Sequence, residues 1–255
     1  MVAITTQELM EAGVHFGHLT RKWNPKMSEY IFMENNGIHI IDLNKTIKCM
    51  EEAAAHLKGV VRSGRKIMFV ATKKQAKDII VSEATRLNMP YVTERWLGGM
   101  LTNFATIRKS LKRLSQIDKM MKDDTFTNIT KKEKLTITRE RAKLQKQLGG
   151  IVDLNRLPAA LFVIDVKREH IAVAEAQKLN IPVFAMVDTN SDPSDIDFPI
   201  PANDDAFKSI SIVTGYISKA IEEGLNERKK DKEDSNQKGA EDEKRRVDEV
   251  VEETK

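Results

Sequence analysis

Ile67-Met68-Phe69-Val70-Ala71 is an unbroken apolar run, and it decides the fold because such a run predicts a strand buried on both faces of a parallel sheet. A helix is expected over residues 74–87, shortly after this run. Similar runs predict strands at residues 160–165 and 183–187, with a helix at 169–179 between them. Apolar strands that alternate with helices are the signature of a doubly wound α/β fold with a parallel sheet.

The chain divides into parts of different composition. Residues 1–102 and 149–226 are expected to form one discontinuous α/β domain, interrupted by an insertion over residues 103–148. Beyond Leu225 apolar residues almost vanish, and charges of both signs alternate with small polar residues. Residues 227–255 are therefore expected to form a disordered charged tail.

The ends of the α/β domain are also expected to contain regular elements. Residues 38–42 predict a strand, which a helix follows to about residue 62. A last helix is expected over about residues 206–224. Residues 14–36 are expected to be irregular, with a turn at Trp23-Asn24-Pro25.

The insertion predicts a protruding antiparallel coiled-coil hairpin. Glycine pairs at 98–99 and 149–150 flank it and allow the chain to turn sharply, so the hairpin would project about 25–30 Å from the domain. Residues 122–128 have turn chemistry, and Thr130 with Glu133 resembles a capping box for the return helix. Apolar residues of the first helix recur every three and four positions, the spacing of a coiled-coil seam: Phe104, Ile107, Leu111, Leu114 and Ile117.

Positive charge is concentrated in this insertion. From Asn103 to Leu148 the sequence has thirteen lysine and arginine residues against five acidic ones, whereas the whole chain has a net charge of +4. A solvated coiled-coil surface normally mixes the two signs, so the excess indicates a surface that grips a polyanion. A cytosolic coiled-coil adaptor, whose hairpin would bind a protein with little dependence on salt, is an alternative.

The remaining composition bounds the class of protein. The chain has 255 residues and 40% hydrophobic content, which is enough to bury a core. Cys49 is the single cysteine, so no intramolecular disulfide can form, and this fits a reducing cytosol. The sequence predicts no signal peptide, and no apolar run approaches the roughly 20 residues of a membrane span. We therefore expect a soluble, intracellular protein with no membrane partner.

The loops after the first two expected strands speak against an enzyme. Neither the segment after residues 38–42 nor the one after 67–71 contains the glycines of a dinucleotide or P-loop motif. No serine lies in a nucleophile-elbow motif. Lys73 and Lys74 could contact a single phosphate at a helix start or form an ordinary solvated helix end. A doubly wound small-molecule or nucleotide-binding enzyme is therefore the second hypothesis.

A metal site is a further candidate. His18 together with two aspartates from loops after late strands could bind zinc through mixed nitrogen and oxygen ligands. The alternative is a histidine bonded to the backbone and aspartates that form turns or cap a helix. The candidate ligands are His18, Asp188, Asp204 and Asp205.

Basic and aromatic residues supply the candidate nucleic-acid contacts. Arg21-Lys22-Trp23 and Arg95-Trp96 each place a cation beside a ring, which suits stacking on RNA, although buried structural tryptophans are equally common. Phosphate and shape contacts are the expected mode because no RNA-recognition sequence motif is present. The candidates are Arg21, Lys22, Trp23, Lys73, Lys74, Arg95, Trp96, Asn103, Arg108, Lys109, Lys112, Arg113, Lys131 and Lys132.

Several of these segments occur together, in order, in one family. From about residue 3 to 226 the chain resembles bacterial small-subunit ribosomal protein S-two, a member of the universal uS2 family. The segments that carry the resemblance are Ala12-Gly13-Val14-His15-Phe16-Gly17-His18, Trp23-Asn24-Pro25-Lys26-Met27, Ile38-His39-Ile40-Ile41-Asp42-Leu43, Arg95-Trp96-Leu97-Gly98-Gly99-Met100-Leu101-Thr102-Asn103 and Val187-Asp188-Thr189-Asn190-Ser191-Asp192-Pro193.

The resemblance implies a flavodoxin-like three-layer α/β/α sandwich with a protruding coiled-coil hairpin. It also implies a structural component of the small subunit, in the cytoplasm, that catalyses no reaction and requires no cofactor. Its partners would be small-subunit rRNA and neighbouring ribosomal proteins, including ribosomal protein S-one. A zinc ion near His18 would then concern protein docking rather than catalysis.

Overall fold

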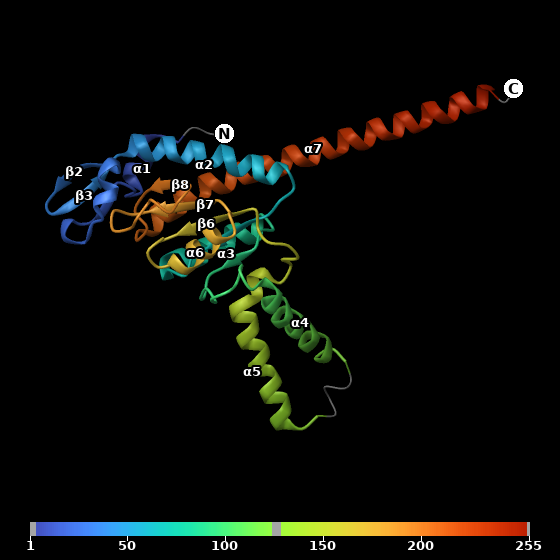
Figure 1. Cartoon of the computed structure of the whole chain (residues 1–255), viewed down its shortest axis with the longest axis horizontal. Coiled ribbons are helices and arrows are strands. Elements are labelled where there is room, and N and C mark those ends of the chain that lie inside the picture. Colours follow the sequence, from blue (N-terminus) through green and yellow to red (C-terminus); the bar gives the residue numbers. More distant parts are fainter. Residues whose placement is uncertain (1–3, 124–128, 254–255) are drawn as a thin grey trace.

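Residues 4–123 and 129–253 are described in this computed structural model, with side chains described as far as Asp231 at the carboxyl end. A parallel sheet lies at the centre of the body (Figure 1). Its order is β5 (Tyr91–Val92), β4 (Ile67–Val70), β6 (Ala160–Ile164), β7 (Val183–Val187) and β8 (Phe198–Pro201), and all neighbours pair in parallel. The predicted doubly wound α/β fold is confirmed.

Both faces of this sheet are buried, and alternate residues of each strand point to opposite faces. Phe69 and Phe162 contribute to one hydrophobic cluster, which α2 (Leu43–Arg62), α3 (Lys74–Arg86) and α7 (Phe207–Glu253) cover. Met68 and Leu161 contribute to the other cluster, which α6 (His170–Lys178) and the base of the insertion cover. The body is therefore the expected three-layer sandwich.

A second, three-stranded antiparallel sheet precedes the main one. Its order is β1 (Phe16–Leu19), β3 (Ile38–Ile41) and β2 (Ile31–Asn35), and short 3-10 helices η1 (Thr20–Lys22) and η2 (Pro25–Tyr30) connect β1 to β2. The expectation that residues 14–36 are irregular is therefore wrong. Asn36 and Gly37, with φ of 51° and 74°, form the tight turn between β2 and β3. An Asn-Gly pair is the strongest local signal for such a hairpin, and the sequence contained it.

The insertion forms two helices that project from the body (Figure 1). They are α4 (Phe104–Met120) and α5 (Lys131–Leu148), with residues 124–128 of the predicted turn outside the described residues. The predicted capping box is present, because Thr130 and Glu133 each bind the other's backbone amide. The seam is one-sided: α4 buries four apolar residues, whereas Leu148 is the only buried residue of α5. Coiled-coil packing of the pair stays a prediction.

The carboxyl-terminal helix α7 is longer than the sequence predicts. The tail was expected to be disordered from residue 227, but α7 continues to Glu253. The first residues of this extension are ion-paired to α2, since Lys58 Nζ lies 2.7 Å from Glu227 Oε1 and Arg62 Nε lies 3.0 Å from Asp231 Oδ2. Charges that read as solvated in the sequence therefore attach the start of the tail to the body.

Two glycines at the root of the hairpin have specific roles. Gly99 adopts φ of 84°, the left-handed region that side chains disfavour. Gly150 has no such φ, but a Cβ there would lie 2.2 Å from the carbonyl oxygen of Tyr91 in β5. The chain re-enters the body so close to the edge strand that only a residue without a side chain fits.

We predict that Gly150→Ala lowers the free energy of unfolding by about 1–3 kcal/mol, because the added methyl group overlaps backbone that cannot yield cheaply. Gly98→Ala is the matched control, since a Cβ at Gly98 meets nothing within 4 Å. Urea unfolding followed by circular dichroism measures both variants. Equal stability of the two variants would contradict this account of the hairpin root.

Candidate nucleic-acid interface and metal centre

The hairpin carries the densest set of exposed candidate cations. Arg108, Lys109 and Lys112 are exposed on α4, and Lys131 and Lys132 are exposed at the start of α5. Arg113 differs from them, because its Nε donates to Glu140 Oε1 at 3.0 Å and links the two helices. The free cations are those a polyanion could neutralise, and the paired arginine stabilises the hairpin itself.

The segment that starts the hairpin contains both exposed and buried candidates. Arg95 is exposed, and so is Asn103, whose Oδ1 accepts a hydrogen bond from Thr106 Oγ1 at 2.9 Å. Trp96 is only 6% exposed and lies in the second hydrophobic cluster. Its proposed stacking on RNA is therefore wrong: the ring is a core side chain, as the alternative interpretation stated.

Glu175 of α6 binds the loop from which the hairpin starts. Its carboxylate accepts hydrogen bonds from Trp96 Nε1 at 3.0 Å and from the amides of Gly99 at 2.7 Å, Leu101 at 2.9 Å and Thr102 at 3.0 Å. Burial by itself would raise the pKa of Glu175, but these hydrogen bonds outweigh burial and hold the pKa below its ordinary value. The sequence analysis missed this residue, which it placed only within a helix.

The candidates near the amino terminus form a separate surface. Arg21, Lys22 and Trp23 follow β1, and all are exposed. The Trp23 ring is 37% exposed and packs against His39 of β3, with ring centroids 4.9 Å apart. The antiparallel sheet that carries them lies at the far side of the body from the hairpin (Figure 1). The candidate residues thus do not merge into one patch.

Lys73 and Lys74 have different environments although they are adjacent. Lys74 is exposed, whereas Lys73 is 9% exposed and points into the end of the sheet. The Lys73 ammonium lies 2.7 Å from Asp204 Oδ1, 2.6 Å from Asp205 Oδ1 and 3.6 Å from Asp165 Oδ2. The expected phosphate contact at Lys73 is therefore wrong, because its charge is already neutralised by carboxylates.

The candidate metal ligands meet at the carboxyl ends of the strands. His18 Nδ1 lies 3.0 Å from Asp188 Oδ2, and His18 Nε2 lies 3.3 Å from Asp205 Oδ2. His18, Asp188 and Asp204 each offer a ligand atom within 4.8 Å of the others. Asp188 follows β7 and Asp204 follows β8, so neighbouring parallel strands bring these carboxylates together.

The close approach of charged groups in this cluster shifts the pKa values of its members. Burial, together with the nearby carboxylates of Asp188 and Asp165, raises the pKa of Asp204 to about 7, although Lys73 acts in the opposite direction. The hydrogen bond to Asp188 raises the pKa of His18, and burial only partly opposes it. Asp204 Oδ2 is buried without a hydrogen-bond partner among the described residues.

Another buried carboxylate, that of Glu169, lies beside this cluster and was not predicted. Glu169 accepts hydrogen bonds from the backbone amide of Thr72 at 3.0 Å and from the Thr72 hydroxyl, which also accepts from Arg168 Nε at 2.8 Å. Burial raises the pKa of Glu169, and the bonds from Thr72 only partly offset it. Thr72 follows β4 and Glu169 follows β6, so the shared position after strand ends was the available signal.

Comparisons with known proteins agree on one family. The family model described as "Ribosomal protein S2" matches residues 9–224. The small ribosomal subunit protein uS2 of Cytophaga hutchinsonii is 66% identical over 245 residues, which cover 96% of each chain. That of Flavobacterium johnsoniae is 64% identical over 230 residues, covering 90% of this chain and 91% of the relative.

These matches define the class as a structural protein of the small ribosomal subunit, which is not an enzyme and is part of the cytoplasmic ribosome. The chain belongs to the ribosomal protein S2 family. The resemblance drawn from the sequence motifs is thereby confirmed, and the hypothesis of a small-molecule enzyme is wrong. Among the residues that the structure describes, no helix is both long and apolar enough to cross a membrane.

We predict that Glu175→Gln lowers the free energy of unfolding at pH 7 by about 2 kcal/mol, because an amide replaces a buried carboxylate that accepts several charge-assisted bonds. Since the folded-state pKa of Glu175 lies below 4.5, its stabilisation is complete above that pH and is lost as the pH falls through the folded-state pKa.

Chemical denaturation at pH 7 and at acidic pH measures this difference. The two proteins should converge in stability at the acidic pH. Glu51→Gln, a change at an exposed position of α2, is the control. A Glu175→Gln protein as stable as the control at pH 7 would show that the carboxylate does not stabilise the loop.

Proposed function

We propose that the hairpin and the basic loops bind small-subunit rRNA by phosphate and shape contacts, while the α/β body supports neighbouring ribosomal proteins. The observation that carries this proposal is the set of exposed cations on the projecting helices α4 and α5. Cations on projecting helices can reach phosphates of a folded RNA that cations on the surface of the α/β body could not reach. Because the chain belongs to the ribosomal protein S2 family, small-subunit rRNA is the polyanion that these cations would bind.

Docking of ribosomal protein S-one belongs to this proposal but rests on the family resemblance. A feature that suits protein contact is the antiparallel sheet, where Phe16, Phe32 and Met33 are 48%, 70% and 49% exposed. Large apolar side chains exposed on one sheet suit a surface that another protein covers.

We predict that the triple variant Lys109→Glu, Lys112→Glu and Lys132→Glu reduces incorporation into small subunits several-fold at low salt, and that its remaining incorporation falls less steeply with added salt than that of the unaltered chain. Each substitution removes a cation that can neutralise a phosphate and adds a repelling charge. Occupancy of the tagged protein in sedimented subunits, measured by quantitative mass spectrometry at low and raised salt, reports the effect.

The control for this experiment has the same change in net charge at exposed lysines outside the hairpin: Lys48→Glu, Lys178→Glu and Lys208→Glu. It should incorporate nearly as well as the unaltered chain. If both triple variants lose occupancy equally, the hairpin has no special role in binding rRNA.

We also propose that His18, Asp188 and Asp204 hold a zinc ion that stabilises this edge for protein docking. The donor set suits zinc, and the orphaned Asp204 Oδ2 is a buried oxygen that lacks a partner among the described side chains. Asp205, which also lies against His18, is 53% exposed and already binds Lys73, so it is the weakest of the candidate ligands. When bound, the ion would supply positive charge that now comes from Lys73 and His18.

We predict that zinc binding, measured by isothermal titration calorimetry on the full chain, weakens as the pH falls through about 7. Protons then compete for Asp204, whose pKa lies there, and for His18, whose pKa is raised. His18→Ala should abolish binding, and Lys73→Gln should strengthen it by freeing Asp204. Unchanged binding in His18→Ala would place any zinc elsewhere.

A further inference from the structure

A large hollow lies at the root of the hairpin, at the amino ends of β4 and β6, whereas the metal cluster lies at the carboxyl ends of the strands. Its volume is about 760 Å³. Three segments line it: the loop that enters β4, the first turn of α4 and the loop that enters β6. A volume of this size accommodates a ligand as large as a nucleotide.

The walls of this hollow are cationic and unpaired. Arg65, Arg108 and Arg156 come one from each segment, and all are exposed. Among the described residues none of these guanidinium groups forms an ion pair, in contrast to Arg62, which binds Asp231. Asp153 is the one acidic residue among the described residues that line the hollow. Three arginines that no carboxylate neutralises indicate an anionic ligand.

The same hollow has apolar surface beside these charges. Phe104 lines it, is half-buried and packs against the second hydrophobic cluster, which fixes its position. Leu157, which also lines the hollow, is 41% exposed. An aromatic ring held in place among cations suits a ligand with a flat ring and a phosphate, which is the chemistry of a nucleotide.

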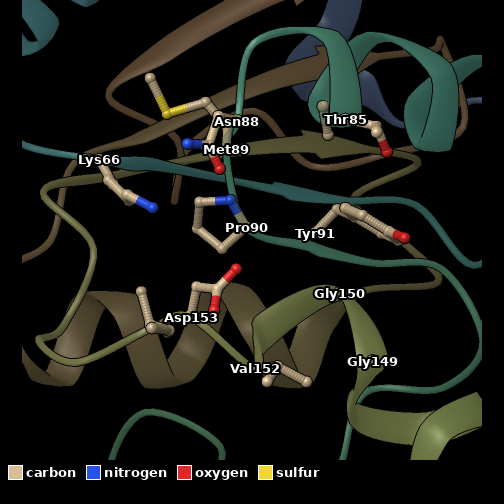
Figure 2. A pocket seen from close by; sticks show the side chains of 12 residues that line it. Lys66, Thr85, Asn88, Met89, Pro90, Tyr91, Gly149, Gly150, Val152 and Asp153 are labelled. Atoms are coloured by element: carbon tan, nitrogen blue, oxygen red, sulfur yellow. The ribbon is translucent and has the colours of Figure 1, made fainter.

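A smaller hollow of about 210 Å³ adjoins the first, and Lys66, Asp153 and Leu154 line both. Figure 2 shows Lys66 and Asp153 directed toward Pro90 from different sides, above the turn of Gly149 and Gly150. Tyr91 gives this second space an aromatic residue, but among the described residues that line it there is no arginine and Lys66 is the one cation. The larger hollow is therefore the one that matches a nucleotide.

We propose that the larger hollow receives one unpaired nucleotide of RNA, with its base against Phe104 and Leu157 and its phosphates at Arg65, Arg108 and Arg156. The inference rests on the proposed rRNA binding of the hairpin and deepens it by adding a site for a single-stranded nucleotide. The arginines are spread over three segments rather than gathered around one point, so they suit a backbone that runs past the hollow. A free mononucleotide would leave most of them unsatisfied.

The test measures binding of a fluorescein-labelled, single-stranded octa-adenylate to the full chain by fluorescence anisotropy. Arg156→Glu, at an exposed position, should weaken binding about tenfold and reduce its salt dependence. Phe104→Leu keeps apolar packing but removes the ring, so it should weaken binding about five- to tenfold with an unchanged salt dependence. Thermal unfolding of each variant confirms that it is folded.

Lys48→Glu is the matched control, because it reverses an exposed lysine on α2 outside the hollow. It should change the affinity less than twofold. Phe104→Leu should not change the affinity for a duplex of equal length. The unaltered chain should bind adenosine monophosphate far more weakly than the octa-adenylate.

Unchanged affinity in Arg156→Glu or in Phe104→Leu overturns the proposal, and so does equal affinity for adenosine monophosphate, which would indicate a site for free nucleotides. These outcomes leave the proposed function intact if the hairpin triple variant still loses incorporation. Conversely, a triple variant that incorporates normally contradicts the proposed function, whatever the octa-adenylate does.

Discussion

The position of the hairpin depends on one buried carboxylate. Glu175 accepts hydrogen bonds from a tryptophan side chain and from backbone amides of the loop that leads into α4. That loop has no regular secondary structure of its own, so its amides have no ladder partners, and an unpaired buried amide would cost as much as a lost hydrogen bond. The Glu175 carboxylate on α6 thus supplies the hydrogen-bond acceptors that a strand or helix would otherwise provide for these amides. The direction in which the cationic helices leave the body follows from it.

The carboxyl ends of the strands present carboxylates rather than cations, and other side chains of the chain itself contact these carboxylates. In doubly wound enzymes the carboxyl ends of the strands form the crevice that holds a ligand. Here Lys73 enters that crevice from the start of α3 and neutralises Asp204 and Asp205, while His18 approaches from β1. The ligand position of the fold is occupied by the chain's own side chains. This is consistent with a family whose members are structural parts of the small subunit.

Much of the fold could be predicted from the sequence, because apolar runs such as residues 67–71 leave little choice but a doubly buried strand. The two helices of the insertion were also predictable, from the spacing of the apolar residues in α4 and the capping box of α5, whereas their coiled-coil packing stays a prediction. The antiparallel sheet was predicted only in part: a strand was expected at residues 38–42, where β3 lies, but β1 and β2 were missed although Asn36-Gly37 signals a hairpin turn. The residues of β2 do not alternate between buried and exposed. The candidate site was predicted in part: His18, Asp188 and Asp204 do meet, but whether Trp96 and Lys73 were buried could not be known. Their burial depends on Glu175 and on the aspartates after β6 and β8, partners 79 and 131 positions away.

The insertion also dictates an order of events during synthesis. β6 pairs with β4 at the centre of the sheet, yet the whole hairpin separates these strands in the chain. When β4 and β5 leave the ribosome that is making them, their neighbour has not been translated, and contacts between distant segments close slowly. The hairpin helices therefore emerge before the sheet that anchors them exists, and before Glu175 can bind their starting loop. A nascent chain of this protein exposes its cationic arm first and acquires its rigid base afterwards.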